Sequence, residues 1–252
     1  SMTALSTTAP DLAPAAVEAL VRHVYGIEGS ARPLAGERDQ NCLVQASHGR
    51  RYVLKISNPS EPAAVVDFQI AALDHIARVS PDLPVPRVVR TVDGSPHSSV
   101  RLPGDRETRV RMLTYLDGLQ ICETERTAAQ RRAMGRGLAE LNRALHGFAH
   151  PGAAHDLLWN VATAHRLTDQ LDGLVDDERR ALARAFMTRF TMHVLPRLPS
   201  MRSQIIHNDY HFYNVLVAPD DHARIVGIID FGDMVHAPLV GEVATAAASH
   251  TA

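Results

Sequence analysis

The chain has 252 residues, of which 45% are hydrophobic and 21% are charged, a balance typical of a globular protein with one large domain or two joined lobes. A formal net charge of −2 gives no general attraction to nucleic acid or to an anionic membrane, so we expect neither as a partner. Cys42 and Cys122 fit no zinc spacing and no disulfide framework, and no signal segment or membrane span is recognisable, so we expect a cytoplasmic location.

The first part of the chain predicts a mostly antiparallel sheet with one inserted helix. Residues 1–12, rich in Thr, Ala and Pro, are expected to form a flexible arm, and 13–26 has helical periodicity that ends at Gly26. Strand-like runs follow at 41–46, 51–57, 85–92 and 108–116. Between them, 62–80 has the apolar spacing of an amphipathic helix. We expect this lobe to span residues 13–116.

Beyond a candidate hinge at Leu116–Gln120, the pattern becomes mainly helical. Amphipathic helices are predicted at 127–148, 157–174 and 177–195. A strand-loop-strand segment at 205–217 and a second hairpin leg at 224–233 follow. The sequence therefore predicts an α+β protein in which residues 117–252 form a second, mainly helical lobe.

The segment "IIHNDYHFYNVLV", residues 205–217, places His207, Asp209 and Asn214 in the spacing H-x-D-x-x-x-x-N, and Asp230 begins a D-F-G sequence on the far leg of the predicted hairpin. Loops between strands often collect such residues for backbone reasons alone, but these fixed residue types at these intervals are not expected by chance. Phosphoryl transfer requires a carboxylate to orient the attacking hydroxyl and oxygen ligands to hold magnesium on the phosphates. We therefore expect Asp209 to be the catalytic base, and Asn214 and Asp230 to bind Mg²⁺.

The segments "HNDYHFYNVLV" and "GIIDFGDMVHAPLVGEVATA" resemble the aminoglycoside phosphotransferase and choline kinase-like family of small-molecule kinases, and within it the hydroxylysine kinase branch. The resemblance covers about residues 15–250 and implies a two-lobed, protein-kinase-like fold with a nucleotide-binding N-terminal lobe and a catalytic C-terminal lobe. It also implies ATP or GTP as the donor. The acceptor it implies is the hydroxyl of a small amino-bearing molecule such as hydroxylysine.

The chain departs from the family at Asn208, where the family usually has Gly. Asn is the side chain that best replaces Gly at a left-handed position, so we expect that conformation here. The neighbouring His207 is expected to brace the loop from behind rather than to donate a proton.

By the same resemblance, Lys55 in "YVLKIS" corresponds to the strand lysine that contacts the nucleotide phosphates. A partner for this lysine is expected on the helix at 62–80, and two candidates remain open. Asp67 makes the better ion pair, whereas Gln69 lies nearer the usual spacing.

Two further segments are expected to contact the nucleotide. "LAGERDQNCLV", residues 34–44, takes the place of the glycine-rich loop, with polar side chains from Arg38, Asp39, Gln40 and Asn41. "RMLTYLDG", residues 111–118, resembles the interlobe segment whose backbone binds the purine, and it contains Leu113 and Tyr115.

Asp233, Glu242 and Trp159 are the candidates for binding the acceptor. Asp233, next to the D-F-G sequence, is the better candidate to hold a substrate amine, since Glu242 equally fits a capping or solvent-facing role and a lone Trp on a helix is more often core. An aminoglycoside O-phosphotransferase is the alternative function. Because 20 residues follow Gly232 where relatives continue through further helices, a truncated nucleotide-binding module without catalysis is a third reading. The acceptor, the choice of ATP or GTP and the oligomeric state stay open.

Overall fold

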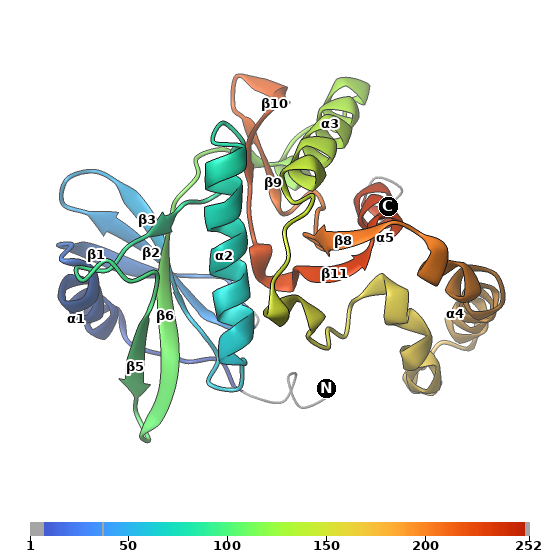
Figure 1. Ribbon diagram of the computed structural model, residues 1–252, viewed down its shortest axis with the longest axis horizontal. Helices are drawn as coiled ribbons and strands as arrows, with labels where there is room; N and C mark the ends of the chain where they lie inside the picture. The colour runs from blue at the N-terminus through green and yellow to red at the C-terminus, as the bar shows by residue number, and fades with distance from the viewer. Residues whose placement is uncertain (1–7, 37, 250–252) are drawn as a thin grey trace.

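The computed structural model describes residues 8–36 and 38–249, and it shows a mixed α/β protein with an antiparallel sheet on one side and a mainly helical half on the other (Figure 1). Of the expected N-terminal arm, residues 1–7 lie outside the described residues. Leu12 is not part of a loose arm, because its N–H and its carbonyl oxygen both bond the side-chain amide of Gln40, at 2.8 and 2.7 Å.

The N-terminal sheet has the antiparallel strand order β1-β2-β3-β6-β4, with β5 also paired to β6. Its strands are β1 (Gly29–Leu34), β2 (Gln40–Ala46), β3 (Arg51–Ile56), β4 (Val88–Val89), β5 (Ser98–Leu102) and β6 (Arg106–Thr114). The runs at 41–46, 51–57 and 108–116 are confirmed as strands. The run at 85–92 is reduced to β4, because Pro86 has no N–H for a ladder, and β1 and β5 were not predicted.

The two faces of this sheet have different partners. On β3, Tyr52, Leu54 and Ile56 point to a core formed with α1 (Pro14–Tyr25), which ends at Gly26 in the left-handed conformation, as predicted. Lys55 lies between them in sequence and therefore points to the opposite face. That face is covered by α2 (Ala63–Val79), so the strand alternation directs Lys55 toward the centre of the molecule.

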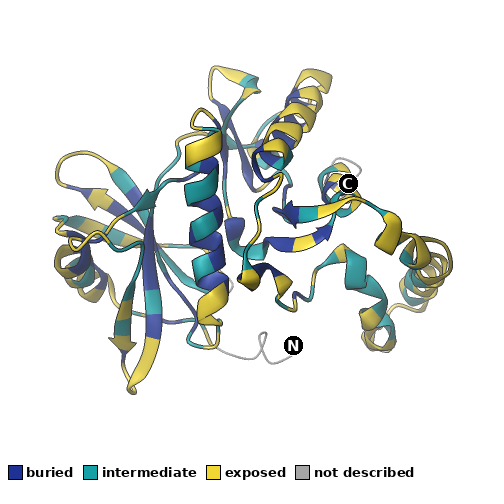
Figure 2. Cartoon of the chain, viewed as in Figure 1, coloured by how far each residue is buried: buried dark blue, intermediate teal, exposed yellow. Residues whose placement is uncertain are grey.

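Helix α2 lies between the sheet and the C-terminal half (Figure 1). Its buried side chains, such as Phe68 and Ile76, pack in one core with Leu141 of α3 (Ala128–Ala144) and with Val215 and Ile228. Figure 2 shows the buried residues concentrated on this helix and on the strands around it. A shared core of this kind fixes the sheet relative to the C-terminal half, and thus both walls of the space between them.

The described part of the C-terminal half contains two small antiparallel sheets, with helices around them. The strands are β7 (Leu119–Gln120), β8 (Ser203–Ile206), β9 (Val215–Ala218), β10 (Asp221–Ile228) and β11 (Val235–Pro238). The predicted hairpin is the pair β9 and β10, with β7 on the other side of β9, and β8 pairs with β11. The remaining α-helices are α4 (Asp177–Arg189) and α5 (Leu239–Ala248).

The helix predicted at 157–174 was wrong in type. Val161–Gly173 forms 3-10 turns instead, in which the side chains of Asn160, Thr163 and Thr168 bond nearby backbone groups and compete with α-helical hydrogen bonds. The helix predicted at 177–195 ends early, because Pro196 and Pro199 follow in the chain and the backbone changes to π and 3-10 turns after Arg189.

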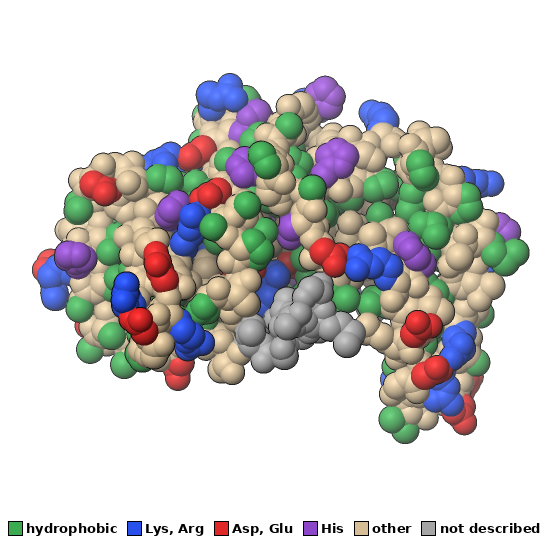
Figure 3. Space-filling model, turned by 60° about the horizontal axis from the view of Figure 1, so that its bottom comes forward, with side chains coloured by type: hydrophobic (Ala, Val, Ile, Leu, Met, Phe, Trp, Pro, Cys, Tyr) green, Lys and Arg blue, Asp and Glu red, His purple; other side chains and the backbone are tan. Residues whose placement is uncertain are grey.

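Within the described part of the chain, no helix is both long and apolar enough to cross a membrane. On the face shown in Figure 3, basic and acidic side chains are interspersed, without a continuous area of one sign. This distribution agrees with the small net charge of −2.

Candidate active site

The loop between β8 and β9 adopts the conformation expected from its sequence. Asn208 has φ of 66°, which confirms the left-handed position. His207 Nε2 lies 2.9 Å from the carbonyl oxygen of Ile229, and the Asp209 N–H donates to His207 Nδ1 at 3.3 Å. Both ring nitrogens of His207 thus contact backbone groups, so the ring braces the loop from behind, as predicted.

Both oxygens of the Asp209 carboxylate have partners from the same loop. Asn214 Nδ2 donates to Asp209 Oδ2 at 2.6 Å, and His211 Nε2 lies 3.0 Å from Oδ1. The hydrogen bond to Asp209 raises the pKa of His211. Asp209 is therefore held in one orientation, which a base needs in order to align a substrate hydroxyl.

Asp230 follows β10 and also has a left-handed backbone, with φ of 61°. Its Oδ1 lies 3.5 Å from Lys55 Nζ and accepts a hydrogen bond from the Gly232 N–H at 3.3 Å. The charge of Lys55 lowers the pKa of Asp230 to about 2, so the carboxylate is ionised at neutral pH. About half of the side chain is exposed, at 52%, which leaves it open to a ligand.

The side chains of Asn214 and Asp230 fit a magnesium site. Because Asn214 directs its amide nitrogen to Asp209, its amide oxygen is turned away and bonds nothing among the described residues. An amide oxygen and an ionised carboxylate are hard ligands of the kind that Mg²⁺ prefers. The described residues contain no group of three or more His, Cys, Asp or Glu that could hold a metal alone. The two residues thus fit an ion that shares its coordination with nucleotide phosphates.

A cavity of about 420 Å³ lies between the N-terminal sheet and the C-terminal half, and it gathers most of the predicted residues. Its lining includes the predicted residues Arg38, Asp39, Asn41, Lys55, Gln69, Trp159, Asp209, Asn214, Asp230 and Asp233, together with Glu61, which the sequence analysis missed. These residues are far apart in sequence, and the shared core brings them together. Leu113, Tyr115 and Glu242 are not among the lining residues.

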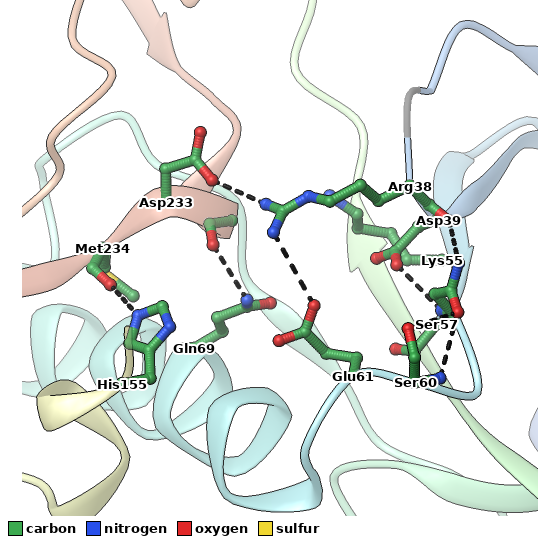
Figure 4. A network of polar contacts seen from close by, with 12 residues as sticks. Arg38, Asp39, Lys55, Ser57, Ser60, Glu61, Gln69, His155, Asp233 and Met234 are labelled. Carbon is green, nitrogen blue, oxygen red and sulfur yellow. Dashed lines mark hydrogen bonds and ion pairs between the residues drawn. The ribbon is translucent and has the colours of Figure 1, made fainter. Parts of the chain in front are cut away.

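Arg38 connects the two walls of this cavity (Figure 4). Its Nη2 donates to Asp233 Oδ1 at 2.6 Å, its Nη1 lies 3.9 Å from Glu61 Oε2, and its guanidinium lies 5.9 Å from the centre of the Trp159 ring. Burial raises the pKa of both Glu61 and Asp233, and the Arg38 charge opposes this in each case. The segment expected to take the place of the glycine-rich loop is thus tied directly to the residue after the D-F-G sequence.

Neither predicted partner of Lys55 contacts it. Asp67 pairs with Arg109 and lies 3.2 Å from His97 Nε2, whereas Gln69 accepts from Arg111 and donates to the Gly232 carbonyl. The register of the sheet explains this, since it places Arg111 of β6 directly beside Lys55. Arg109 and Arg111 of β6 then pair with Asp67 and Gln69 of α2. The lone charge at Arg111 within the apolar run "VRML" was the signal for this buried network.

The predicted purine contacts are engaged within the protein. The Tyr115 N–H donates to the Arg51 carbonyl oxygen at 3.1 Å, and Leu113 packs against the central core. Neither residue lines the cavity, and their contact with a purine stays a prediction.

Glu242 supports the catalytic loop instead of facing an acceptor. It is fully buried, and its Oε2 accepts the Asn208 N–H at 3.1 Å. Burial raises its pKa. The earlier alternatives of capping and solvent exposure are both wrong, because α5 places this carboxylate beneath Asn208.

The family model described as "Phosphotransferase enzyme family" matches residues 30–252. The chain is 29% identical to a hydroxylysine kinase of Danio rerio over 237 residues and 30% identical to that of Mus musculus over 258 residues. These alignments cover 89% and 93% of this chain. They cover only 66% and 68% of the relatives, so the chain spans about two thirds of their length.

Two solved structures have the same fold. A microcompartment-associated aminopropanol kinase matches with a TM-score of 0.72 at 21% identity, covering 92% of this chain and 73% of that one. An amicoumacin kinase in complex with AMP-PNP, Ca²⁺ and Ami matches with a TM-score of 0.71 at 14% identity, covering 92% and 67%. Because the family model matches residues 30–252, which is most of the chain, the chain belongs to the phosphotransferase enzyme family. It also has the two-lobed, kinase-like fold of the two solved structures.

Proposed function

We propose that this chain is a small-molecule kinase that transfers the γ-phosphoryl group of ATP or GTP to the hydroxyl of a small amino-bearing molecule of the hydroxylysine type. One observation carries the proposal: Lys55 from the sheet and Asp209, Asn214 and Asp230 from the other half line a single cavity. The similarity to hydroxylysine kinases supports the same chemistry. In this proposal, residues 13–116 form the nucleotide-binding lobe and 117–252 the catalytic lobe.

Each residue has a separate task in this mechanism. Asp209 accepts the proton of the acceptor hydroxyl, and Asn214 and His211 hold its carboxylate in line with the attack. The Lys55 ammonium neutralises a phosphate oxygen. Mg²⁺, when bound through Asn214 and Asp230, supplies charge neutralisation and orients the phosphates. Most of the rate enhancement then comes from position and charge, with the base adding a smaller factor.

The amino group of the acceptor is assigned to Asp233. This carboxylate lines the same cavity as Asp209 and already pairs with Arg38 at 2.6 Å, so an acceptor amine there shares it with the guanidinium. Trp159 lines the same region and offers an apolar wall.

The test measures nucleoside diphosphate release with Mg²⁺ and either ATP or GTP. The acceptors are hydroxylysine, other amino alcohols and several aminoglycosides, and Asp209→Asn serves as the blank. We expect acceptor-dependent release with the amino alcohols that is absent from the blank. Turnover with aminoglycosides alone would instead favour the resistance-type function. Nucleotide-dependent thermal stabilisation without turnover on any acceptor would indicate a binding module without catalysis.

A further inference from the structure

Arg111 is a buried cation on β6 whose partners come from three different segments. It is only 3% exposed. Its Nη1 donates to Ser57 Oγ at 2.7 Å, its Nη2 donates to Gln69 Oε1 at 2.6 Å, and Nη2 also lies 3.4 Å from Asp39 Oδ2. A buried charge costs several kcal/mol unless it is paired and hydrogen-bonded, so these contacts are strongly favoured. Arg111 is also the register partner of Lys55, so both side chains project from the same face of the sheet.

Gln69 links this cation to the segment that carries Asp230. Its Oε1 accepts from Arg111, and its Nε2 donates to the Gly232 carbonyl oxygen at 3.2 Å. The N–H of Gly232 in turn donates to Asp230 Oδ1 at 3.3 Å. In Figure 4, Gln69 points from α2 toward the segment that leads to Asp233. Gly232 is therefore held at its carbonyl by α2 and at its N–H by the carboxylate of Asp230.

We infer that Gln69 and Arg111 are positioning residues for phosphoryl transfer, which fix Asp230 relative to Lys55 by holding Gly232. The inference rests on the proposed function, since it assigns the pair a role at that site. Lys55 and Arg111 reach the same loop by parallel routes, one by direct contact with Asp230 and the other through the amide of Gln69. Gln69, one of the two residues expected to pair with Lys55, thus joins Arg111 to Gly232 instead.

A glutamine suits this position because the contacts need an acceptor and a donor at the end of one side chain. A glutamate at position 69 retains the acceptor for Arg111 but has no N–H for the Gly232 carbonyl. It also brings carboxylate and carbonyl oxygens together. Gln69→Glu therefore breaks the link to the loop while keeping the link to β6.

Asp67→Asn is the matched control. Asp67 lies on the same helix and pairs with Arg109 of the same strand, so this variant also weakens a contact between α2 and β6. Among the described residues, its contacts are with Arg109 and His97, and none reaches the 230–233 segment. If the polar contacts between α2 and β6 only stabilise the fold, Gln69→Glu and Asp67→Asn should change hydrogen exchange and Mg-ADP affinity to a similar extent.

The first readout is hydrogen-deuterium exchange of residues 229–234 in the free protein, without metal or nucleotide. We expect faster exchange in Gln69→Glu and parental exchange in Asp67→Asn. The second readout is the dissociation constant of ADP with Mg²⁺, measured by calorimetry. It should rise by about 10–100-fold in Gln69→Glu, as is typical when a group that orients a metal ligand is lost, and remain parental in Asp67→Asn.

Gln69→Met removes both polar ends without adding charge and should reproduce both effects. Parental exchange and parental Mg-ADP affinity in Gln69→Glu and Gln69→Met would overturn the inference. A parent protein that binds no Mg-ADP would overturn the proposed function and this positioning role with it. The two failures are distinguishable, because only the second appears in the unmodified protein.

Discussion

The loop that carries Asp209 and the contact between the two walls of the cavity are held in place in different ways. In the loop, Asp209 is bonded by Asn214 and His211, which lie five and two residues away. Across the cavity, Arg38 of the N-terminal half bonds Asp233 of the C-terminal half, a separation of 195 residues. Partners that are close in sequence produce a motif with fixed spacing, whereas distant partners depend on how the whole chain folds. The local contacts of Asp209 can therefore be predicted from the sequence, whereas the contact between Arg38 and Asp233 cannot.

The largest effect is expected on the metal side of the catalytic motif. Asp230→Ala removes both the expected Mg²⁺ ligand and the ion-pair partner of Lys55. The Mg-ADP dissociation constant should rise by at least about 100-fold, because changes to groups that only orient metal ligands already cost about 10–100-fold. Calorimetry with and without Mg²⁺ measures this, and a parental affinity would remove Asp230 from the site.

The next effect tests the backbone of the catalytic loop. Asn208→Ala should lower the free energy of unfolding by about 1 kcal/mol, because Ala at φ of 66° is strained. Asn208→Gly should be close to neutral or stabilising, since the buried Asn208 side-chain nitrogen has no hydrogen-bond partner to lose among the described residues. Denaturant titration of both variants decides this. Equal losses in Ala and Gly would mean that the side chain, not the backbone, matters.

A smaller effect is expected when the long-range contact between Arg38 and Asp233 is removed. Arg38→Gln removes the ion pair with Asp233, whose side chains are 27% and 19% exposed. Partly exposed pairs contribute about 0.2–1 kcal/mol, so the free energy of unfolding should fall by no more than about 1 kcal/mol. Denaturant titration of Arg38→Gln and Asp233→Asn checks this. A loss above about 2 kcal/mol in both variants would show that this long-range contact holds the cavity more strongly than its exposure suggests.

The smallest effect concerns pH. The hydrogen bond to Asp209 raises the pKa of His211 above its ordinary value of 6.5. The contact therefore stabilises the folded state fully below pH 6.5, and its contribution is lost as the pH rises through the raised pKa. Thermal unfolding of the parent and of His211→Gln between about pH 5 and 9 should differ most at acid pH, by up to about 1 kcal/mol. A difference that grows toward alkaline pH would contradict this.

The sequence predicted the parts of the molecule that depend on short-range rules. The helix stop at Gly26, the strand at β3, the hairpin of β9 and β10 and the left-handed Asn208 all follow from residue type and spacing. The candidate residues of the H-x-D-x-x-x-x-N and D-F-G segments also come together as the spacing suggested. Their roles stay proposals.

The predictions that were wrong concern side chains whose partners are set by tertiary packing or by local side-chain bonds to the backbone. Gln69 and Asp67 are both within range of Lys55 in sequence, but each pairs with an arginine on β6 instead. Glu242 is a polar residue on a short helix, and only the packing of α5 under the catalytic loop shows that it is buried. The 3-10 turns at Val161–Gly173 depend on side chains bonding backbone, which a hydrophobic pattern does not detect.

In the proposed mechanism, Asp209 and Asp230 line one cavity but have separate roles, Asp209 as the base and Asp230 as a metal ligand. The most direct measurement pairs turnover with Mg-ADP binding in Asp209→Asn and Asp230→Ala, using an acceptor on which the parent is active. We predict that Asp209→Asn lowers kcat by about 10²–10⁴-fold and leaves Mg-ADP affinity unchanged, whereas Asp230→Ala loses both. Retained turnover in Asp209→Asn, or equal loss of nucleotide affinity in the two variants, would contradict the claim.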